Sequence, residues 1–515
     1  MRKITLFFLL INLMISCSTH KYLPEIKDIL IRSGDNRNEF LKTIDYFQQK
    51  GDTLQLDALY FLLRNMEGHS YYTIALHDST GTEIPFNVLD HENYDLMIMY
   101  LDSLEATKGE LHWKLKDQYN DLETMKSEVL IENIELAFQA WREFPWSQDY
   151  DYDIFLEYIL PYRGSNEPIE SWRPYFMNTF SHITRNESLS SDPLQIAAQI
   201  NREARELFGF DSRFYCNPTD QGITEMLENK LGRCEDMTNF IIYALRANGI
   251  PVTSDYTPHW ANSGNNHAWN AVVTPEGQAI PFMGCEADPG EYQLSAKLGK
   301  AYRKTFAEQK DNLGCRIKEG EEVPAWLRSK YYTDVTTLYT QVANVPLLIE
   351  RDIPDSTRFI FLCVFNSGEW QAIHWSEIVD GKAEFSDMGT DVCYLPMFYY
   401  HKELIPAGDA FILDKNCSIK VLSGESIIPE MSLLSVTKKT ISGSTENRKI
   451  SYLQQGKEYE LFFWHNEWQS LGCQTASEDP LIFRDVPANR LYWLVEKGSK
   501  KEERIFTYSN EQVWW

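Results

Sequence analysis

A cysteine and a histidine far apart in this chain have surroundings that fit nucleophilic chemistry. Cys234 stands just ahead of a run whose apolar residues have helical spacing, and His267 opens the alternating run "HAWNAVV", which is typical of a strand. An imidazole can take the proton of a thiol, which then attacks a carbonyl carbon, and the imidazole later protonates the leaving group. The two residues are therefore a candidate catalytic pair.

A helix must position the thiol. Asn248 and Gly249 followed by Pro251 supply a stop signal, so the helix is expected to begin near Cys234 and end before Gly249. Unpaired N–H groups at a helix N-terminus favour thiolate over thiol. Gly232 permits a tight turn and close approach by a substrate. The competing interpretation is a small buried cysteine without chemistry. The apolar stripe consists of Met237, Phe240, Ile241, Ala244 and Leu245.

These motifs resemble the transglutaminase-like superfamily of papain-related cysteine enzymes. Gly-x-Cys before a helix ending "LRANGIP", and then "HAWN" opening a strand, carry the resemblance over roughly residues 194–289. It implies an α+β core and a Cys-His-Asp triad with Cys234 as nucleophile and His267 as base. The family includes cross-linking transferases, peptidases and amidases that share an acyl-thioester intermediate, and its members commonly need no redox cofactor.

The acid of the triad departs from the family's pattern. Members usually carry Asp-Pro on the returning strand, whereas this stretch reads "IPFMG". With the hairpin turn at residues 274–277, Gly284 lies opposite His267. Glu286 and Asp288 follow on the same face if the strand continues. Asp288, which precedes a proline, is slightly preferred, although the register favours Glu286. Losing the orienting carboxylate can cost about four orders of magnitude in rate, so its absence would indicate a weak or inactive enzyme.

The sequence identifies the oxyanion hydrogen-bond donors less clearly than the catalytic pair. The backbone N–H of Cys234 is the natural first donor, and Gln221 or Tyr215 could supply a second.

The other cysteines argue against a metal or a redox motif. The chain has nine cysteines and no CxxC, so zinc ribbons and thioredoxin-like chemistry are poorly supported, and we expect neither a metal nor a cofactor. Cys285 alternates away from the catalytic face and could pair with Cys315 or Cys216.

The N-terminus has the pattern of a secretory signal. A basic start is followed by an apolar run at residues 4–15 and then by Ser16 and Cys17. This resembles the lipobox of bacterial lipoproteins, in which Cys17 becomes the lipidated first residue; an ordinary cleaved signal is the alternative. No later segment reaches the ~18 apolar residues of a membrane span. We expect a lipid-anchored protein of the bacterial cell envelope, periplasmic or surface exposed.

The remaining sequence indicates helices before the candidate site and strands after it. Residues 130–141 repeat apolar positions with helical spacing, while residues 155–175 mix prolines, aromatics and arginines. The latter segment is either a packed crossover or a ledge beside the active site. Beyond residue 334, short β-branched and aromatic runs indicate β-sandwich material.

Two pairs of similar stretches suggest a tandem repeat in the C-terminal part. "FIFLCVFNSGEWQAI" from Phe359 is similar to "YELFFWHNEWQSL" from Tyr459, and "IPAGDAFIL" from Ile405 is similar to "VPANRLYWL" from Val486. We infer two related β modules, with chance convergence of hairpin sequences as the alternative.

The sequence predicts a multidomain α+β protein. With 515 residues, 43% of them apolar, several folded domains are expected. The net charge of -26 disfavours a nucleic-acid partner. The predicted parts are a lipoprotein signal peptide (1–17), a helical domain (18–192), a transglutaminase-like domain (193–330) and two β-sandwich modules (331–440 and 441–515).

Two functions are compatible with this organisation. The first is an exported cysteine enzyme that hydrolyses or transfers an amide or peptide acyl group, with a peptide, protein or glycopeptide as substrate. The second is a weak or inactive transglutaminase-like scaffold whose β modules bind glycan or peptide through exposed aromatics. The candidate aromatics are Trp370, Trp375, Trp464, Trp468 and Trp493.

Overall fold

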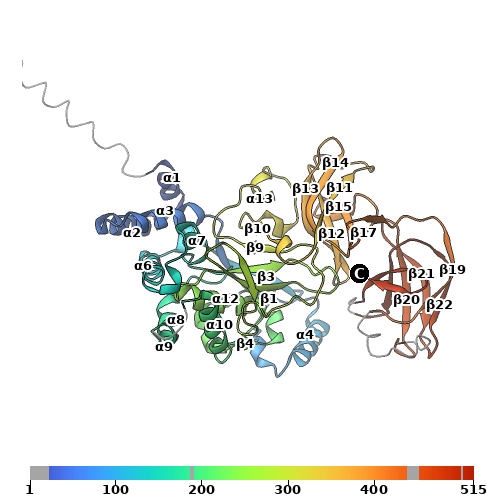
Figure 1. Cartoon of the computed structure of the whole chain (residues 1–515). Helices are drawn as coiled ribbons and strands as arrows, with labels where there is room; N and C mark the ends of the chain where they lie inside the picture. Colours follow the sequence, from blue (N-terminus) through green and yellow to red (C-terminus); the bar gives the residue numbers. More distant parts are fainter. Residues whose placement is uncertain (1–22, 186–190, 438–451, 500–502) are drawn as a thin grey trace, which may run out of the picture. The chain divides into compact units, whose positions relative to one another are not determined.

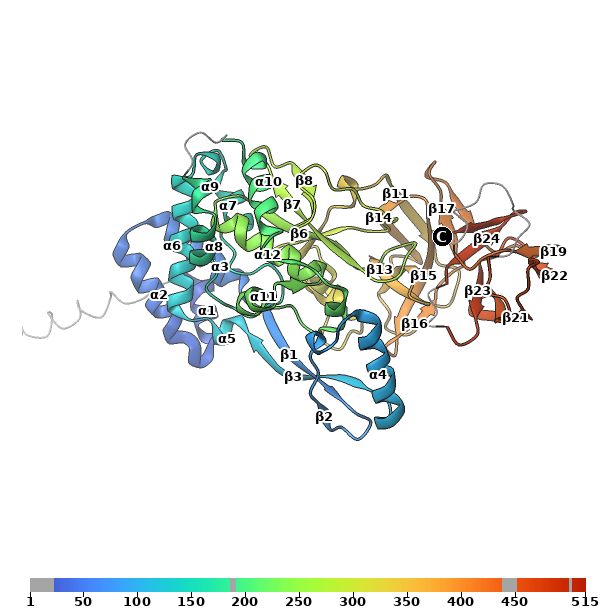
Figure 2. The same cartoon turned by 90° about the horizontal axis from the view of Figure 1, so that it is seen from below.

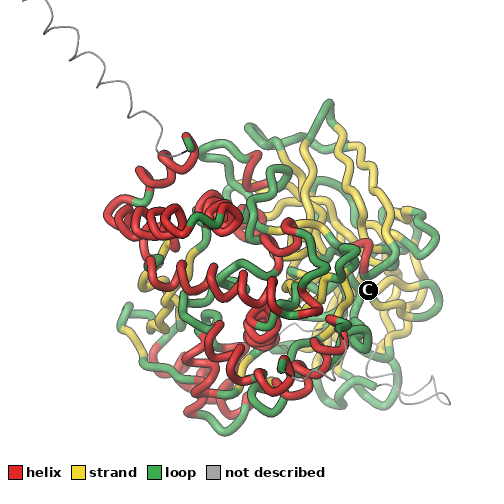
Figure 3. Tube along the Cα trace, turned by 60° about the vertical axis from the view of Figure 1, so that its left-hand side comes forward, coloured by secondary structure: helices red, strands yellow, loops and turns green. Residues whose placement is uncertain are grey.

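The computed structural model describes residues 23–185, 191–437, 452–499 and 503–515 (Figure 1). The predicted signal peptide and Cys17 lie outside these residues. The chain divides into two compact units. One contains Met1–Val252 and Val272–Pro289, and the other contains Thr253–Ala271 and Gly290–Trp515. The mixture of helices and strands confirms the multidomain α+β class (Figure 3). The finer domain borders stay predictions.

The first unit is mainly helical, as the sequence predicts for most of it. Residues 130–141 lie in α6, where Leu130, Ile134, Ala137 and Phe138 are at most 1% exposed and form its packed face. The helices of the unit are α1 (Pro24–Arg32), α2 (Arg37–Lys50), α3 (Thr53–Asn65), α4 (Tyr94–Lys108), α5 (Asp121–Thr124), α6 (Ser127–Glu143), α7 (Tyr152–Tyr158), α8 (Arg173–Thr179), α9 (Ser181–Thr184), α10 (Pro193–Ala204), α11 (Ile223–Asn229) and α12 (Cys234–Ala247).

An antiparallel sheet that the sequence did not indicate interrupts these helices. β1 (Ser70–His77) lies between β2 (Glu83–Ile84) and β3 (His112–Asn120), and α4 lies beside the sheet (Figure 2). Most of β3 is exposed, so the strand lacks the apolar alternation by which a half-buried strand is recognised. The part of the chain predicted as a helical domain at residues 18–192 therefore also contains a small sheet.

The second unit contains the strands that surround the candidate histidine. β7 (His267–Val273) follows β6 (Val252–Thr257), and the sheet runs in the order β10-β9-β6-β7, with β9 at Tyr302–Lys304 and β10 at Tyr332–Asp334. The short helix α13 (Leu313–Arg316) lies between β9 and β10 in the sequence. Each of these strands is short, and β7 is buried along nearly its whole length.

Two strand-rich modules follow β10 in the sequence. In the first, a two-stranded sheet β11-β14 and a sheet of order β13-β12-β15-β17-β18 enclose one hydrophobic core, with β16 paired to β15. The strands are β11 (Val342–Leu348), β12 (Phe359–Asn366), β13 (Glu369–Glu377), β14 (Lys382–Gly389), β15 (Val392–Tyr400), β16 (Glu403–Pro406), β17 (Phe411–Leu413) and β18 (Ile419–Val421).

In its described residues, the second module repeats this topology except that β16 has no counterpart. A two-stranded sheet β19-β22 and a sheet of order β21-β20-β23-β24-β25 enclose a core of their own. Its strands are β19 (Ile427–Leu433), β20 (Glu458–Trp464), β21 (Trp468–Thr475), β22 (Leu481–Pro487), β23 (Tyr492–Glu496), β24 (Ile505–Tyr508) and β25 (Gln512–Trp514). The predicted tandem repeat is confirmed for the hairpins β12-β13 and β20-β21, which occupy equivalent places.

The second pair of similar stretches is not equivalent in the fold. The stretch from Ile405 ends in β17, whereas the stretch from Val486 ends in β23, whose neighbours make it the counterpart of β15. That similarity is the chance convergence named as the alternative.

The tryptophans proposed to bind glycan contribute to a core. Trp370, Trp464 and Trp493 are 5–8% exposed, and Trp375 and Trp468 pack partly buried against the same cluster. Trp464 and Trp468 make an edge-to-face pair with ring centroids 5.1 Å apart. The aromatics therefore stabilise the modules instead of forming an open stacking surface. In the described part of the chain, no helix combines the length and apolar character that crossing a membrane requires.

Candidate active site

Cys234 is the first residue of α12, as the sequence predicts. The helix ends at Ala247, and Gly249 adopts a positive φ of 74° after it. The predicted apolar stripe is buried, but so are polar residues on the other faces, including Asp236, Asn239 and Arg246. The thiol is 8% exposed. The structure thus places a nearly buried cysteine at the positive end of a helix that is enclosed on all sides.

Gly232 has a different role from the one expected. A Cβ atom there would lie 2.6 Å from the Cβ of Asp236 and 2.7 Å from the ring of Phe208. The glycine is therefore required because the protein packs against itself at this point, and the close approach of a substrate need not be invoked.

A buried carboxylate closes the N-terminus of α12. Asp236 accepts hydrogen bonds from the backbone N–H groups of Arg233 and Gln221, each at 3.0 Å. Burial and the nearby charge of Asp220 raise the pKa of Asp236 to about 6. This capping arrangement fixes the turn that carries the thiol.

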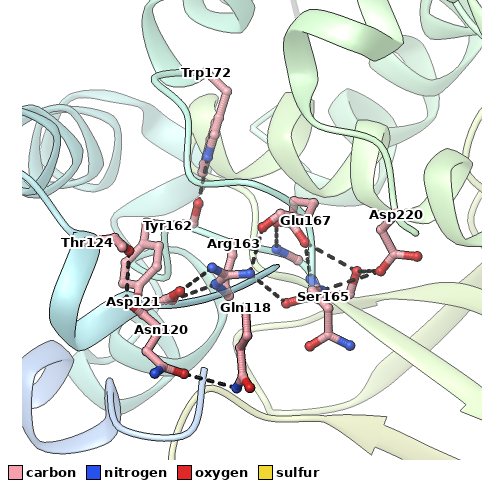
Figure 4. A network of polar contacts seen from close by, with 12 residues as sticks. Gln118, Asn120, Asp121, Thr124, Tyr162, Arg163, Ser165, Glu167, Trp172 and Asp220 are labelled. Atoms are coloured by element: carbon pink, nitrogen blue, oxygen red, sulfur yellow. Dashed lines mark hydrogen bonds and ion pairs between the residues drawn. The ribbon is translucent and has the colours of Figure 1, made fainter. Parts of the chain in front are cut away.

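The segment at residues 155–175 is a packed crossover. Arg163 is 4% exposed and donates to both carboxylate oxygens of Asp121, at 2.8 and 2.5 Å, and Tyr162 donates to the same acid at 2.7 Å (Figure 4). Burial alone lowers the pKa of Arg163, but the charges of Asp121 and Glu167 outweigh it and raise the pKa. The packed-crossover interpretation is confirmed.

Polar contacts connect this crossover to the turn that carries Cys234. Glu167 accepts from the backbone N–H of Ser165 at 2.7 Å (Figure 4). It also accepts from the hydroxyl of Tyr243 at 2.5 Å. The Ser165 hydroxyl donates to Asp220 at 2.6 Å, and Arg233 donates to the other oxygen of Asp220 at 2.7 Å. The network ends one residue before Cys234. Sequence periodicity could not reveal it, because buried charges carry no apolar pattern.

Arg246 fastens the same crossover to the far end of α12. Its guanidinium donates to the carbonyl oxygens of Tyr158, Arg163 and Val252 at 3.1, 2.8 and 3.2 Å. Burial lowers the pKa of Arg246 to about 10. Arg246 lies in the last turn of α12, where a cation balances the helix dipole, and it also satisfies carbonyl groups of the crossover.

The two oxyanion candidates differ in their surroundings. The pKa of Tyr215 is raised by burial and by the nearby charge of Cys234, so the phenol lies within electrostatic reach of the thiol. Gln221 is fully buried, and its amide bonds the carbonyl of Leu231 and the side chain of Asn229. This geometry favours a structural role for Gln221. The role of Tyr215 as an oxyanion donor stays a prediction.

His267 begins β7, as expected, in an aromatic environment. Its ring stacks on Trp260 with centroids 5.7 Å apart and lies 5.9 Å from the ring of Trp269. Burial lowers the pKa of His267 to about 4, so the imidazole is neutral near pH 7. The Nε2 atom lies 2.6 Å from the hydroxyl oxygen of Tyr292, a residue that the sequence analysis did not identify.

Both β modules hold the loop that precedes His267. The side-chain amide of Asn366 donates to the carbonyl oxygens of Trp260 and Asn265 at 3.0 and 2.8 Å. Arg504, from the second module, donates to the carbonyl oxygen of Ala261 at 3.0 Å. A loop with this many bonded carbonyl groups presents the histidine in a fixed position.

The register argument for the triad acid is wrong. β8 (Ala279–Phe282) ends before the acids, because the chain turns and Met283 bridges to Ala287. Glu286 lies in this turn and is exposed. A triad role for Glu286 or Asp288 thus loses its geometric support.

Asp288 has ion-pair partners of its own. It is bound by Arg202 of α10 at 2.5 Å and by Arg205, the C-cap residue of that helix, at 2.6 Å. Asn201, also on α10, donates a further hydrogen bond to Asp288 at 3.2 Å. In this chain, the aspartate of the Asp288-Pro289 pair therefore anchors a turn to a helix.

Cys285 does not form either of the two disulfides that the sequence left open, with Cys315 or with Cys216. Among the described residues, Cys285, Cys315 and Cys216 are all free, and burial raises the pKa of the Cys285 thiol. The described residues also contain no cluster of three or more His, Cys, Asp or Glu side chains that could hold a metal ion.

Comparison with known proteins identifies a domain within the chain. Residues 182–282 match the model of the transglutaminase-like superfamily, a range that includes both Cys234 and His267. A search of curated proteins finds no match.

Solved structures give only low similarity scores. A candidate cysteine protease from Cytophaga hutchinsonii has 16% identity and a TM-score of 0.21, covering 28% of this chain and 45% of that one. LapG from Legionella pneumophila has 14% identity and a TM-score of 0.19, covering 33% and 80%. A red sea bream transglutaminase has 8% identity and a TM-score of 0.18, covering 78% and 75%. The chain thus spans less than half of the Cytophaga protein. The family match therefore carries the identification: this chain contains a transglutaminase-like domain at residues 182–282.

Proposed function

We propose that the protein is a cysteine enzyme that cleaves or transfers amide acyl groups through a thioester on Cys234. The observation that carries the proposal is the position of Cys234, the first residue of the enclosed helix α12 within the family match. Backbone N–H groups at that helix end favour the thiolate and can bind a developing oxyanion. His267, neutral in its aromatic surroundings, is the proposed base.

The proposed reaction has two halves. The Cys234 sulfur attacks the carbonyl carbon of a carboxamide or peptide while its proton passes to His267, so that a C–S bond forms. The C–N bond then breaks, and the imidazolium gives its proton to the departing ammonia or amine. Water, or a second amine in the transfer reaction, attacks the thioester and restores the thiol. We favour hydrolysis of a peptide, protein or glycopeptide.

Thiol reactivity tests this proposal. The rate at which iodoacetamide labels Cys234 is measured against pH by mass spectrometry in the unsubstituted protein, in His267→Ala, and in His259→Ala as a control. His259 matches His267 in that burial lowers its pKa to about 4. We expect fast labelling below the free-thiol pKa of about 8.5, slowed only by His267→Ala. Labelling no faster than that of an ordinary exposed thiol, or unaffected by His267→Ala, contradicts the enzyme.

A binding scaffold is the less favoured alternative. Its main support was the set of tryptophans in the β modules, and these pack into a core. An unreactive Cys234 would restore this alternative, and the modules would then be tested for glycan and peptide ligands.

We also propose that the chain is exported and lipid-anchored in a bacterial envelope. The supporting evidence is the residue pattern that ends at Ser16-Cys17. Metabolic labelling with a fatty-acid analogue should modify the full chain and should fail with Cys17→Ala. Labelling that survives Cys17→Ala, or no labelling at all, contradicts the anchor.

A further inference from the structure

The contact between Tyr292 and His267 connects a phenol to the proposed catalytic base. The hydroxyl oxygen of Tyr292 lies 2.6 Å from Nε2 of His267, within strong hydrogen-bonding distance. The two rings are 6.2 Å apart at an angle of 43°, so they meet at their polar edges and are not stacked. Trp260 and Trp269 contact the same imidazole. Nε2 of His267 is therefore in hydrogen-bonding contact with a hydroxyl, and aromatic rings surround the imidazole.

Two buried acids that could have oriented this histidine are engaged elsewhere. Asp255, on the neighbouring strand β6, is fully buried and bound by both Arg303 nitrogens at 2.8 Å and by the hydroxyl of Tyr339. Asp288 is bound by Arg202 of α10 and by Arg205, the C-cap residue of that helix. Among the described residues, no carboxylate forms an ion pair or hydrogen bond with the His267 ring. A hydroxyl thus stands where an orienting acid was expected.

We propose that Tyr292 is the positioning residue for His267 and replaces the carboxylate of a Cys-His-Asp triad; this inference rests on the proposed function. Nε2–H donates to the Tyr292 oxygen, which leaves the Nδ1 lone pair free. The Cys234 S–H bond breaks as Nδ1–H forms, and the same proton later moves from Nδ1 to the leaving amine. Tyr292 keeps its own proton throughout.

A phenol differs from a carboxylate in two physical respects. A carboxylate only accepts hydrogen bonds, so it holds the imidazole in one tautomer, whereas a hydroxyl can accept or donate. A carboxylate also carries the charge that stabilises an imidazolium, and a neutral hydroxyl does not. An imidazolium beside the Tyr292 phenol is therefore stabilised less than an imidazolium beside a carboxylate.

The same substitution at two tyrosines tests the role of Tyr292. Tyr292→Phe removes the hydroxyl that contacts His267. Tyr339→Phe removes a hydroxyl that donates to Asp255, and the ring of Tyr339 contacts Trp269. We expect Tyr292→Phe to slow iodoacetamide labelling of the nucleophile about tenfold at pH 7, and Tyr339→Phe to change it less than twofold. Circular dichroism and thermal melting identify any variant that fails to fold.

Nitrogen NMR of the histidine ring shows which nitrogen of His267 carries the proton. A purely structural role of Tyr292 would not change this tautomer. In the unsubstituted protein we expect the proton of His267 on Nε2, and in Tyr292→Phe a mixture of both tautomers. The ring resonance is assigned by its loss in His267→Ala. A proton found on Nδ1 in the unsubstituted protein overturns the proposal without requiring any variant at Tyr292.

The outcomes separate this inference from the proposed function. If His267→Ala slows labelling while Tyr292→Phe leaves both the rate and the tautomer unchanged, the enzyme stands and the role of Tyr292 is wrong. If His267→Ala has no effect, both fall. If both variants slow labelling and Tyr339→Phe does not, the proposal is supported.

Discussion

The carboxylate of Asp220 accepts a hydrogen bond at 2.7 Å from the guanidinium of Arg233, the residue that precedes Cys234. Asp220→Asn removes the charge of this partly buried pair, so we expect a loss of about 1–3 kcal/mol of unfolding free energy and slower labelling of Cys234. Urea denaturation and the iodoacetamide rate measure the two effects. Asp211→Asn, in a pair with Arg213 that is local in sequence, is the control. Equal effects of both variants would contradict a special role for Asp220.

The buried pair of Arg163 and Asp121 should be a large contributor to stability. Their side chains are 2% and 0% exposed, so Arg163→Met leaves a buried carboxylate without its cation. We expect a loss of about 3–5 kcal/mol of unfolding free energy, measured by urea denaturation. Arg64→Met, which breaks an exposed pair with Glu25, should cost at most about 1 kcal/mol. A similar loss in the two variants would show that burial of the pair is unimportant.

Acid should destabilise the protein through two histidines. Burial lowers the pKa values of His259 and His267 from 6.5 to about 4, so between these values the unfolded chain binds more protons than the folded one. Stability is therefore full above pH 6.5 and falls toward pH 4, by up to about 3 kcal/mol per histidine. Asp236 acts in the opposite direction, because its folded pKa of about 6 exceeds 3.8.

The histidine contribution can be isolated by substitution. The difference in unfolding free energy between pH 7 and pH 5 should shrink in His259→Gln and persist in His465→Gln, whose histidine is exposed. An unchanged difference in His259→Gln would show that this imidazole is not held neutral by burial.

In the same labelling experiment, the other cysteines should react at rates that depend on whether their thiols are buried or exposed. Burial raises the pKa of Cys285, Cys363 and Cys393, so these thiols should stay unmodified in the native protein at pH 7. Cys417 and Cys473 are exposed and should react as ordinary thiols. Labelling in urea provides the reference in which all sites react. Fast native labelling of the buried group would contradict the described packing.

Removing the guanidinium of Arg504 should weaken the proposed base. Arg504→Met breaks hydrogen bonds to the carbonyl oxygens of Ala261 and Phe365, which lie at 3.0 and 2.8 Å. We expect the His267-dependent part of the labelling rate to fall several-fold. Arg484→Met removes an arginine whose side chain is 77% exposed and should leave the rate unchanged. If Arg504→Met lowers stability but not this rate, the second module has no influence on the histidine loop.

The elements that carry the candidate pair could be predicted because their signals are local. The stripe after Cys234 and the stop at Gly249 fix α12 within one stretch of sequence, and the alternation after His267 does the same for β7. The turn at residues 274–277 also formed as expected, with Gly277 at a φ of 78°. Periodicity and turn chemistry suffice where neighbouring residues decide the structure.

The parts of the fold and of the candidate site that could not be predicted depend on contacts between residues far apart in the sequence. The sheet of β1 and β3 pairs Ser70 with Asn120, and no local pattern announces such a pairing. Extending the β8 strand to Asp288 failed because a turn intervened, which shifts every later side chain. Tyr292 was missed because a tyrosine outside regular structure has no signature until the histidine beside it is known.

The bonds from Arg504 to the loop before His267 have a consequence for the order of events during synthesis. The loop leaves the ribosome before Arg504, which follows Ala261 by 243 residues, so these carbonyl groups are not satisfied until the strands of the second module have been made. A chain truncated by a premature stop codon would contain both Cys234 and His267 and yet lack this support. Synthesis of the second module thus sets the earliest point at which the histidine loop acquires its final form.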